Sequence, residues 1–159
     1  MKSRILTALI LFPPVIYVIG WSPWWLFLMA VLLTAETALH EYFGICRQSG
    51  LEILPVHGYV GAVGTILAAG LAVRGGPDLT FIFLAAFLLL TMSWAVFRTG
   101  DSKQYLSAVA ASVLGVLYIA LPLSFLVLLR FRDASNGKNL ILLLFLVIWA
   151  GDICAYFVG

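Results

Sequence analysis

The sequence predicts an all-α fold, a polytopic transmembrane helical bundle with about six spans. The 159-residue chain is 64% hydrophobic and only 10% charged, whereas soluble domains are about 45–50% apolar and about 25% charged. Its mean hydropathy is +1.12. A soluble domain of this size could not hide so much apolar surface, and a lipid solvent explains the excess directly. The composition therefore excludes a soluble globular enzyme, a disordered chain and a disulfide-stapled secreted domain.

Six apolar stretches account for the predicted spans, against about 20 residues expected for each. They are residues 5–19, 24–39, 56–73, 79–97, 105–129 and 140–158. The first is interpreted as a retained span, because a small-x-small cleavage site of a signal peptide is missing. Pro13 and Pro14 are expected to kink its helix. The first two stretches are short, so they either tilt or form a hairpin that does not cross fully, and five to seven spans fit the pattern.

The segments between the stretches have the composition of loops and turns. Residues 20–23 are an uncharged turn, residues 40–55 are polar and charged, and residues 74–78, 98–103 and 130–138 combine Gly or Asn with charges. In a six-span topology five Lys or Arg side chains fall on the side of the N-terminus and four on the other. These are Lys2, Arg4, Arg47, Arg98 and Lys103 against Arg74, Arg130, Arg132 and Lys138. The positive-inside rule therefore gives little help with orientation.

Small residues recur every four positions in the third and sixth spans, a spacing that lets helix backbones approach closely. They are Gly61, Thr65 and Ala69, with Gly64 and Ala68, in the third span, and Gly151, Ala155 and Gly159 in the sixth. The general abundance of Gly and Ala in membrane helices explains the pattern equally well, so both interpretations stay open. The two cysteines, Cys46 and Cys154, have no metal-ligand spacing and are expected to be buried thiols.

Ionisable side chains at membrane depth are costly and usually face a partner or a cavity. Asp152 is the more informative of two candidates, because Trp149, Asp152 and Tyr156 fall on one helical stripe at i, i+3 and i+7. Such a carboxylate can bind a cation, accept a hydrogen bond from a substrate or pair with a buried base. A structural aspartate bonded to a neighbouring helix is the alternative. Glu36 is expected to pair with His40, one turn later.

Other catalytic motifs are missing from the sequence. His57 begins an apolar stretch beside Pro55, where a histidine usually caps or anchors a helix at the membrane interface rather than acting in catalysis. There is no Gly-rich phosphate loop, no zinc-binding histidine motif and no convincing Ser/His/Asp set. The net charge of +2 is too small for a nucleic-acid footprint, so no nucleic acid is expected as a partner.

Two segments resemble the phosphatidate cytidylyltransferases, also called CDP-diacylglycerol synthases. The N-terminal segment has a basic pair, Lys2 and Arg4, before an apolar run with Pro13 and Pro14, and residues 38–42 (ALHEY) resemble the family's alanine-rich helix that ends in Glu and an aromatic residue. Residues 149–159, WAGDICAYFVG, resemble the family's Trp-Ala-Asn/Gly-Asp-Thr-Gly-Ala-Tyr motif, with Ile153 and Cys154 in place of Thr and Gly.

The resemblance implies a membrane enzyme that transfers a cytidylyl group from CTP to phosphatidic acid, giving CDP-diacylglycerol and pyrophosphate in phospholipid biosynthesis. It implies a multi-pass protein of the cell (inner) membrane that uses Mg²⁺. Asp152 is then the expected catalytic and metal-binding residue, and Tyr156 is expected to line the substrate cavity. The partners it implies are CTP, phosphatidic acid and the lipid bilayer, with a homo-oligomer as one option for the assembly.

One departure from the family pattern concerns the signature segments, a Ser, Lys-Arg and Lys-Asp cluster followed by His-Gly-Gly and Asp-Arg-x-Asp. Nothing in residues 1–159 matches them. We therefore expect these residues to be the N-terminal transmembrane region of a larger enzyme, without its catalytic C-terminal half and inactive alone. A non-catalytic membrane scaffold and a transporter fragment are the alternatives. A transporter is expected to show repeat symmetry and broken helices in matching positions, and the sequence has neither.

Overall fold

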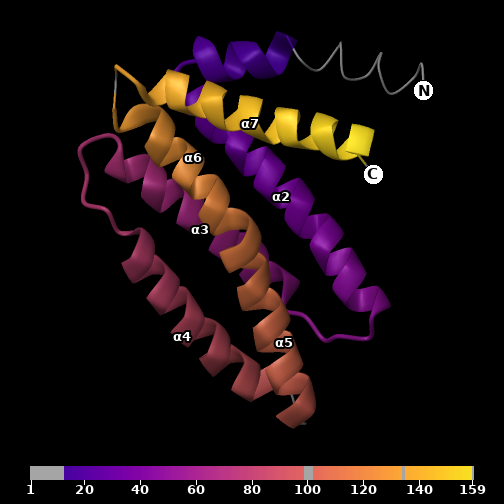
Figure 1. Cartoon of the computed structure of the whole chain (residues 1–159). Coiled ribbons are helices and arrows are strands. Elements are labelled where there is room, and N and C mark those ends of the chain that lie inside the picture. Colours follow the sequence, from indigo (N-terminus) through magenta and orange to yellow (C-terminus); the bar gives the residue numbers. More distant parts are fainter. Residues whose placement is uncertain (1–12, 99–101, 134, 159) are drawn as a thin grey trace. The chain divides into compact units, whose positions relative to one another are not determined.

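The structure is a computed structural model that describes residues 13–98, 102–133 and 135–158. These residues contain helices and no strand, as Figure 1 shows. The elements are α2 (Trp24–Gln48), α3 (Pro55–Ala72), α4 (Thr80–Arg98), α5 (Ser102–Gly115), the π-helical segment η1 (Val116–Ala120), α6 (Leu121–Phe131) and α7 (Gly137–Val158). The chain divides into two compact units, Met1–Phe27 with Leu129–Gly159, and Leu28–Leu128. Each unit is described by itself.

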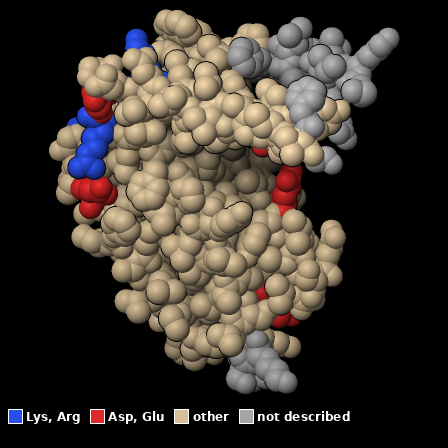
Figure 2. Space-filling view, in the orientation of Figure 1, with Lys and Arg blue, Asp and Glu red and all other residues tan. Residues whose placement is uncertain are grey.

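Five helical stretches among the described residues are long and apolar enough to cross a membrane, which confirms the predicted all-α polytopic fold. They correspond to the second to sixth predicted spans. Residues 5–12 of the first predicted span, which include the turn before Pro13 where a kink was expected, lie outside the described residues, and residues 13–20 are helical. In Figure 2 apolar and uncharged side chains cover most of the visible face, and Lys, Arg, Asp and Glu gather in a few places.

The end predicted for the second span was wrong. Residues 40–48 were expected to belong to a polar connection, but α2 continues to Gln48 and is 25 residues long. Leu39, Phe43 and Cys46 follow one another at i, i+4 and i+7, and all three side chains are buried. This apolar stripe carries the helix through the charged segment, while Glu41 and Arg47 point away from the core and are exposed. The second span is therefore not short.

Glycines set how closely α3 packs against its neighbours in the larger unit. A Cβ atom at Gly61 would lie 2.5 Å from the Phe87 ring, and one at Gly64 would overlap the Phe83 ring. Gly61, Thr65 and Ala69 are all buried, so the small-residue pattern predicted in the third span is a packing surface. It accepts the aromatic side chains of α4, which packs against α3 along the pair of helices.

The fifth predicted span is one helical stretch of 28 residues, Gln104–Phe131, interrupted by the π-helical segment η1. The backbone N–H of Leu121 donates to the carbonyl of Val116, five residues earlier. Pro122 follows directly; it has no N–H, and in a regular helix its ring would clash with the carbonyl of Tyr118. Widening the turn before Pro122 relieves that clash, and the widened segment packs against α3.

Two serines of α5 hold the connection between α2 and α3. The Ser112 hydroxyl accepts a hydrogen bond from the Leu54 backbone N–H at 2.8 Å, and the Ser107 hydroxyl accepts one from Glu52 N–H at 3.1 Å. Leu54 immediately precedes α3, where helix N–H groups lack partners within the helix. Side chains of α5 thus position the start of α3.

Candidate functional site

Helix α7, which carries the two predicted site residues, begins at a loop organised by Asp133. Its carboxylate accepts hydrogen bonds from the Ser135 hydroxyl at 2.6 Å and from the backbone N–H groups of Ser135 and Asn136 at 2.9 and 3.2 Å. The Asn136 side-chain amide donates to the other carboxylate oxygen at 3.1 Å. These bonds, the Ser135 hydroxyl first, lower the pKa of Asp133 from 3.8 to about 2.

Arg130 fixes the end of α6 within the same unit. Its Nε donates to the carbonyl of Ile19 at 2.6 Å and its Nη2 to that of Gly20 at 3.2 Å. The guanidinium carbon also lies 4.9 Å from the centre of the Phe131 ring. Phe131 in turn meets Phe27 edge to face, with 5.5 Å between ring centres. The end of α6 is therefore tied to the turn before α2.

Asp152 and Tyr156 lie on the second half of α7, and both side chains are exposed. Because α7 is one continuous α-helix through Val158, Trp149, Asp152 and Tyr156 do share the predicted stripe. No described atom lies within 4 Å of where a Cβ at Gly151 would stand. Cys154 was expected to be buried and is exposed, whereas Cys46 is buried as predicted. Asp152, Gly151 and Ala155 are thus exposed on this part of α7.

The described residues hold no group of three or more His, Cys, Asp or Glu side chains placed to bind a metal ion. Asp152 is thus the single carboxylate that the α7 stripe offers. One carboxylate fits Mg²⁺ when substrate phosphates and water complete the coordination, which is how this ion is usually bound at phosphoryl-transfer sites. It does not fit an ion held entirely by protein ligands.

Glu36 does not make the contact predicted for it. His40 Nδ1 lies 3.1 Å from the hydroxyl of Tyr59 on α3, so the imidazole hydrogen-bonds across helices rather than along α2. The Oε1 atom of Glu36 is buried and has no hydrogen-bond partner among the described residues. Sequence spacing pointed to the i, i+4 neighbour, but the rotation of α2 that buries Phe43 against Tyr59 (ring centres 5.6 Å apart) turns His40 toward α3.

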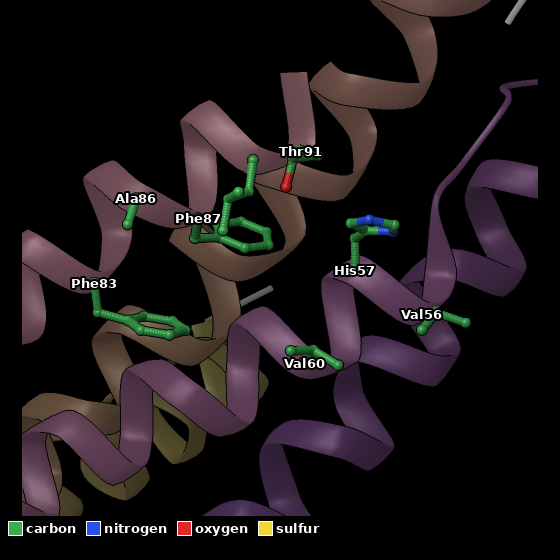
Figure 3. A pocket seen from close by; sticks show the side chains of 8 residues that line it. Val56, His57, Val60, Phe83, Ala86, Phe87 and Thr91 are labelled. Carbon is green, nitrogen blue, oxygen red and sulfur yellow. The ribbon is translucent and has the colours of Figure 1, made fainter. Parts of the chain in front are cut away.

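A cavity of about 230 Å³ lies between α3 and α4. It is lined by Val56, His57, Val60, Phe83, Ala86, Phe87, Leu90 and Thr91 (Figure 3). The His57 ring packs on Trp94 with 5.3 Å between ring centres, near the start of α3; the interfacial anchor predicted for it stays a prediction. Sequence reasoning missed this cavity. Its signal was a pair of phenylalanines four residues apart on α4, Phe83 and Phe87, that face two glycines three residues apart on α3, Gly64 and Gly61.

Comparison with known proteins identifies one family. The model of the Cytidylyltransferase family matches residues 2–159, which is nearly the whole chain. No curated protein and no solved structure shows significant similarity to the chain. The matched range includes both segments on which the resemblance rests, the N-terminal one and the α7 motif around Asp152.

Proposed function

Because this chain belongs to the cytidylyltransferase family, we propose that it serves the transfer of a cytidylyl group from CTP to phosphatidic acid, with CDP-diacylglycerol and pyrophosphate as products. The family match over residues 2–159 carries this proposal and supports a nucleotidyltransferase that uses CTP. The five apolar helices favour a lipid acceptor over a soluble one, since they keep the protein in contact with the bilayer.

In the proposed reaction a phosphate oxygen of the lipid attacks the α-phosphorus of CTP. The bond between that phosphorus and the oxygen that bridges to the β-phosphate breaks, and pyrophosphate leaves with the bonding electrons. Negative charge accumulates on the phosphates, so positioning and charge stabilisation dominate the catalysis. Mg²⁺, when bound, would supply much of that charge stabilisation.

Asp152 has the catalytic and metal-binding role in this proposal. As an exposed carboxylate on α7 it would hold the ion beside the CTP phosphates, which supply further ligands. Tyr156 follows one turn later on the same stripe, and its phenol would line the substrate cavity and donate a hydrogen bond to a substrate oxygen. Since CTP is dissolved in the cytosol, the end of α7 that carries both residues would face the cytosol. The membrane would be the cell's inner membrane.

Replacement of Asp152 tests the proposal in the full-length protein that contains these residues. We expect Asp152→Asn to lower the conversion of labelled CTP and phosphatidic acid to CDP-diacylglycerol by at least about tenfold, because the amide cannot supply the charge that acts on the phosphates. Glu52→Gln removes an exposed carboxylate from the connection between α2 and α3 and is the matched control, with activity unchanged per folded molecule. Equal specific activities for the two variants would return Asp152 to a structural role.

The same assay distinguishes the proposed cytidylyltransferase from the alternative functions. We expect no turnover from residues 1–159 alone, and turnover by that chain in detergent would contradict this expectation. A non-catalytic scaffold predicts that the full-length protein leaves CTP unchanged, whatever the residue at position 152. A cytidylyltransferase of a different acceptor predicts release of pyrophosphate with another lipid and none with phosphatidic acid.

A further inference from the structure

The connection between α6 and α7 concentrates positive charge, and we call it the basic loop. Residues 130–138 contain Arg130, Arg132 and Lys138, three of the nine Lys and Arg residues of the chain, and a single acidic residue, Asp133. Arg130 is engaged within the protein, where it donates to two backbone carbonyls. Arg132 and Lys138 are exposed, and neither has a hydrogen-bond or ion-pair partner among the described residues. These two cations are therefore available to an anion.

Asp133, the acid of the basic loop, does not neutralise these cations. Its carboxylate oxygens accept hydrogen bonds from the hydroxyl and backbone N–H of Ser135 and from the side-chain amide and backbone N–H of Asn136. The carboxylate is thus held within its own loop rather than paired with Arg132. Lys138 is the second residue of α7, where the positive end of the helix dipole disfavours a cation. Helix stability therefore does not explain Lys138, whereas an anion bound there is stabilised by the dipole and by both cations.

Exposed tryptophans lie near the basic loop. The bonds from Arg130 to the carbonyls of Ile19 and Gly20 place the turn before α2 next to the end of α6. Trp21 in this turn is 72% exposed, and Trp25 in the first turn of α2 is 59% exposed. Tryptophan is enriched where a membrane protein meets the headgroup layer, because its ring is apolar and its N–H is polar. The two tryptophans therefore indicate that the basic loop lies at the level of the headgroups.

The lengths of the adjoining spans indicate the same depth. The apolar stretch Gln104–Phe131 has 28 residues, about 42 Å of helix, which is enough to cross the hydrocarbon and headgroup layers together. The apolar part of α7, Gly137–Tyr156, has 20 residues, about 30 Å, which matches the hydrocarbon alone. Arg132 directly follows the first stretch and Lys138 is near the start of the second, so both lie at the hydrocarbon boundary or outside it. Asp152 is about 21 Å from Lys138 along the axis of α7.

We propose that Arg132 and Lys138 bind the phosphate of an acidic glycerophospholipid of the surrounding bilayer. Guanidinium and ammonium groups both form charge-assisted hydrogen bonds with phosphate oxygens. An acidic lipid binds more strongly than phosphatidylcholine, because the choline cation offsets the charge of the phosphate. The lipid is a bound ligand that is not consumed. Since the basic loop is remote from Asp152 along α7, the site does not depend on the reaction proposed above.

Native mass spectrometry of the purified chain in detergent tests this site. The chain is mixed with equal concentrations of phosphatidylglycerol and phosphatidylcholine, and the fraction of the protein that carries each lipid is measured. We expect tighter binding of phosphatidylglycerol, and equal binding of the two lipids would overturn the proposal. Arg132→Gln and Lys138→Gln should each lower the association constant for phosphatidylglycerol about fivefold, the effect of one cation near a lipid surface.

Arg47→Gln is the matched control for these variants. It also removes one exposed cation, from the end of α2, and should change the association constant for phosphatidylglycerol less than about twofold, because Arg47 is outside the basic loop. Equal losses from Arg47→Gln and Arg132→Gln would show only a general attraction between opposite charges and would overturn the proposal.

Lys138→Glu separates lipid binding from folding. Its carboxylate suits the positive end of the α7 dipole, so thermal unfolding in detergent without lipid should occur at the wild-type temperature or above it. Binding of phosphatidylglycerol should fall more than about tenfold, because attraction becomes repulsion. Retained binding by this variant would contradict the site. Glycerol phosphate in large excess should leave the lipid bound, since it lacks acyl chains. Displacement of the lipid would assign the site to a soluble phosphate instead.

Discussion

Two glycines within helices, Gly64 of α3 and Gly44 of α2, have different surroundings. Gly64 helps to explain why α3 and α4 approach closely. A Cβ at Gly64 would overlap the Phe83 ring, whereas one at Gly44 of α2 would have no atom within 4 Å. Phe83 therefore occupies the space that a side chain at position 64 would need. Small residues at i, i+4 predicted this packing in the third span. Which aromatic ring lies over each glycine depends on the register of α4 relative to α3, and the spacing of residues within one helix does not reveal that register.

We expect Gly64→Ala to destabilise the protein by about 1–3 kcal/mol, because the added methyl forces Phe83 out of its place. Gly44→Ala is the control, and it should raise stability by up to about 1 kcal/mol, since alanine favours the helix more than glycine does. Thermal unfolding in detergent, followed by circular dichroism, measures both. A similar change in the two variants would mean that the absence of a side chain at Gly64 does not determine the α3–α4 packing.

Side-chain hydrogen bonds decide how the connection before α3 is held. Ser112 is fully buried and binds the Leu54 N–H. Ser112→Ala should cost about 1–3 kcal/mol, because the partly buried N–H of Leu54 loses its acceptor. Ser107→Ala breaks bonds to Glu52 that lie near the surface, so water replaces them and the cost should stay below about 1 kcal/mol. Unfolding of both variants in detergent gives the comparison, and an equal cost would contradict the buried role of Ser112.

The loop that begins α7 should respond to pH through Asp133. Its folded pKa, about 2, lies below the unfolded value of 3.8. Its contribution is therefore fully present above about pH 4 and is lost as the pH falls through about 2. Hydrogen exchange of the Ser135 and Asn136 amides should stay slow at pH 3 in the wild type and be fast in Asp133→Ala. The Gly137 amide, which donates to the Asp133 backbone carbonyl at 2.9 Å, is the internal control. Loss of protection already near pH 4 would be inconsistent with the lowered pKa.

The observed helix bounds agree with those predicted from the sequence where apolar stretches end at Gly or Pro. They differ from the prediction where charged residues lie inside a helix. Gly75 has a φ of +85° and ends α3 near the predicted boundary. At the end of α2 the charges of residues 40–48 indicated a loop, yet the buried stripe of Leu39, Phe43 and Cys46 continues the helix. The composition of a segment counts residues on all faces of a helix, whereas only the face that packs against other helices needs to be apolar. The α7 stripe was predictable for the opposite reason, because helical periodicity alone sets it.

At the scale of the whole molecule, the sequence predicted the lipid environment and the all-α class of fold. Exposure to lipid requires an apolar surface and a backbone whose N–H and C=O groups are hydrogen-bonded within the protein. It also predicted the family through the motif around Asp152, which the match over residues 2–159 confirms. Contacts between separate helices were harder to predict from the sequence. His40 was paired with Glu36 along one helix, but it binds Tyr59 on another, and the cavity between α3 and α4 needs both helices in register.

The two native cysteines allow the orientation of the molecule to be measured without adding a label site. Cys154 is exposed and lies two residues after Asp152, while Cys46 is buried. If the Asp152 end of α7 faces the cytosol, a membrane-impermeant maleimide should label the protein in inside-out vesicles and not in right-side-out ones. Cys154→Ser should abolish the labelling, because the remaining thiol is out of contact with water. CTP with Mg²⁺ should slow the reaction of Cys154 when the nucleotide binds beside Asp152. Labelling from the outer side only would place the α7 stripe away from its nucleotide and would exclude Asp152 from the proposed chemistry.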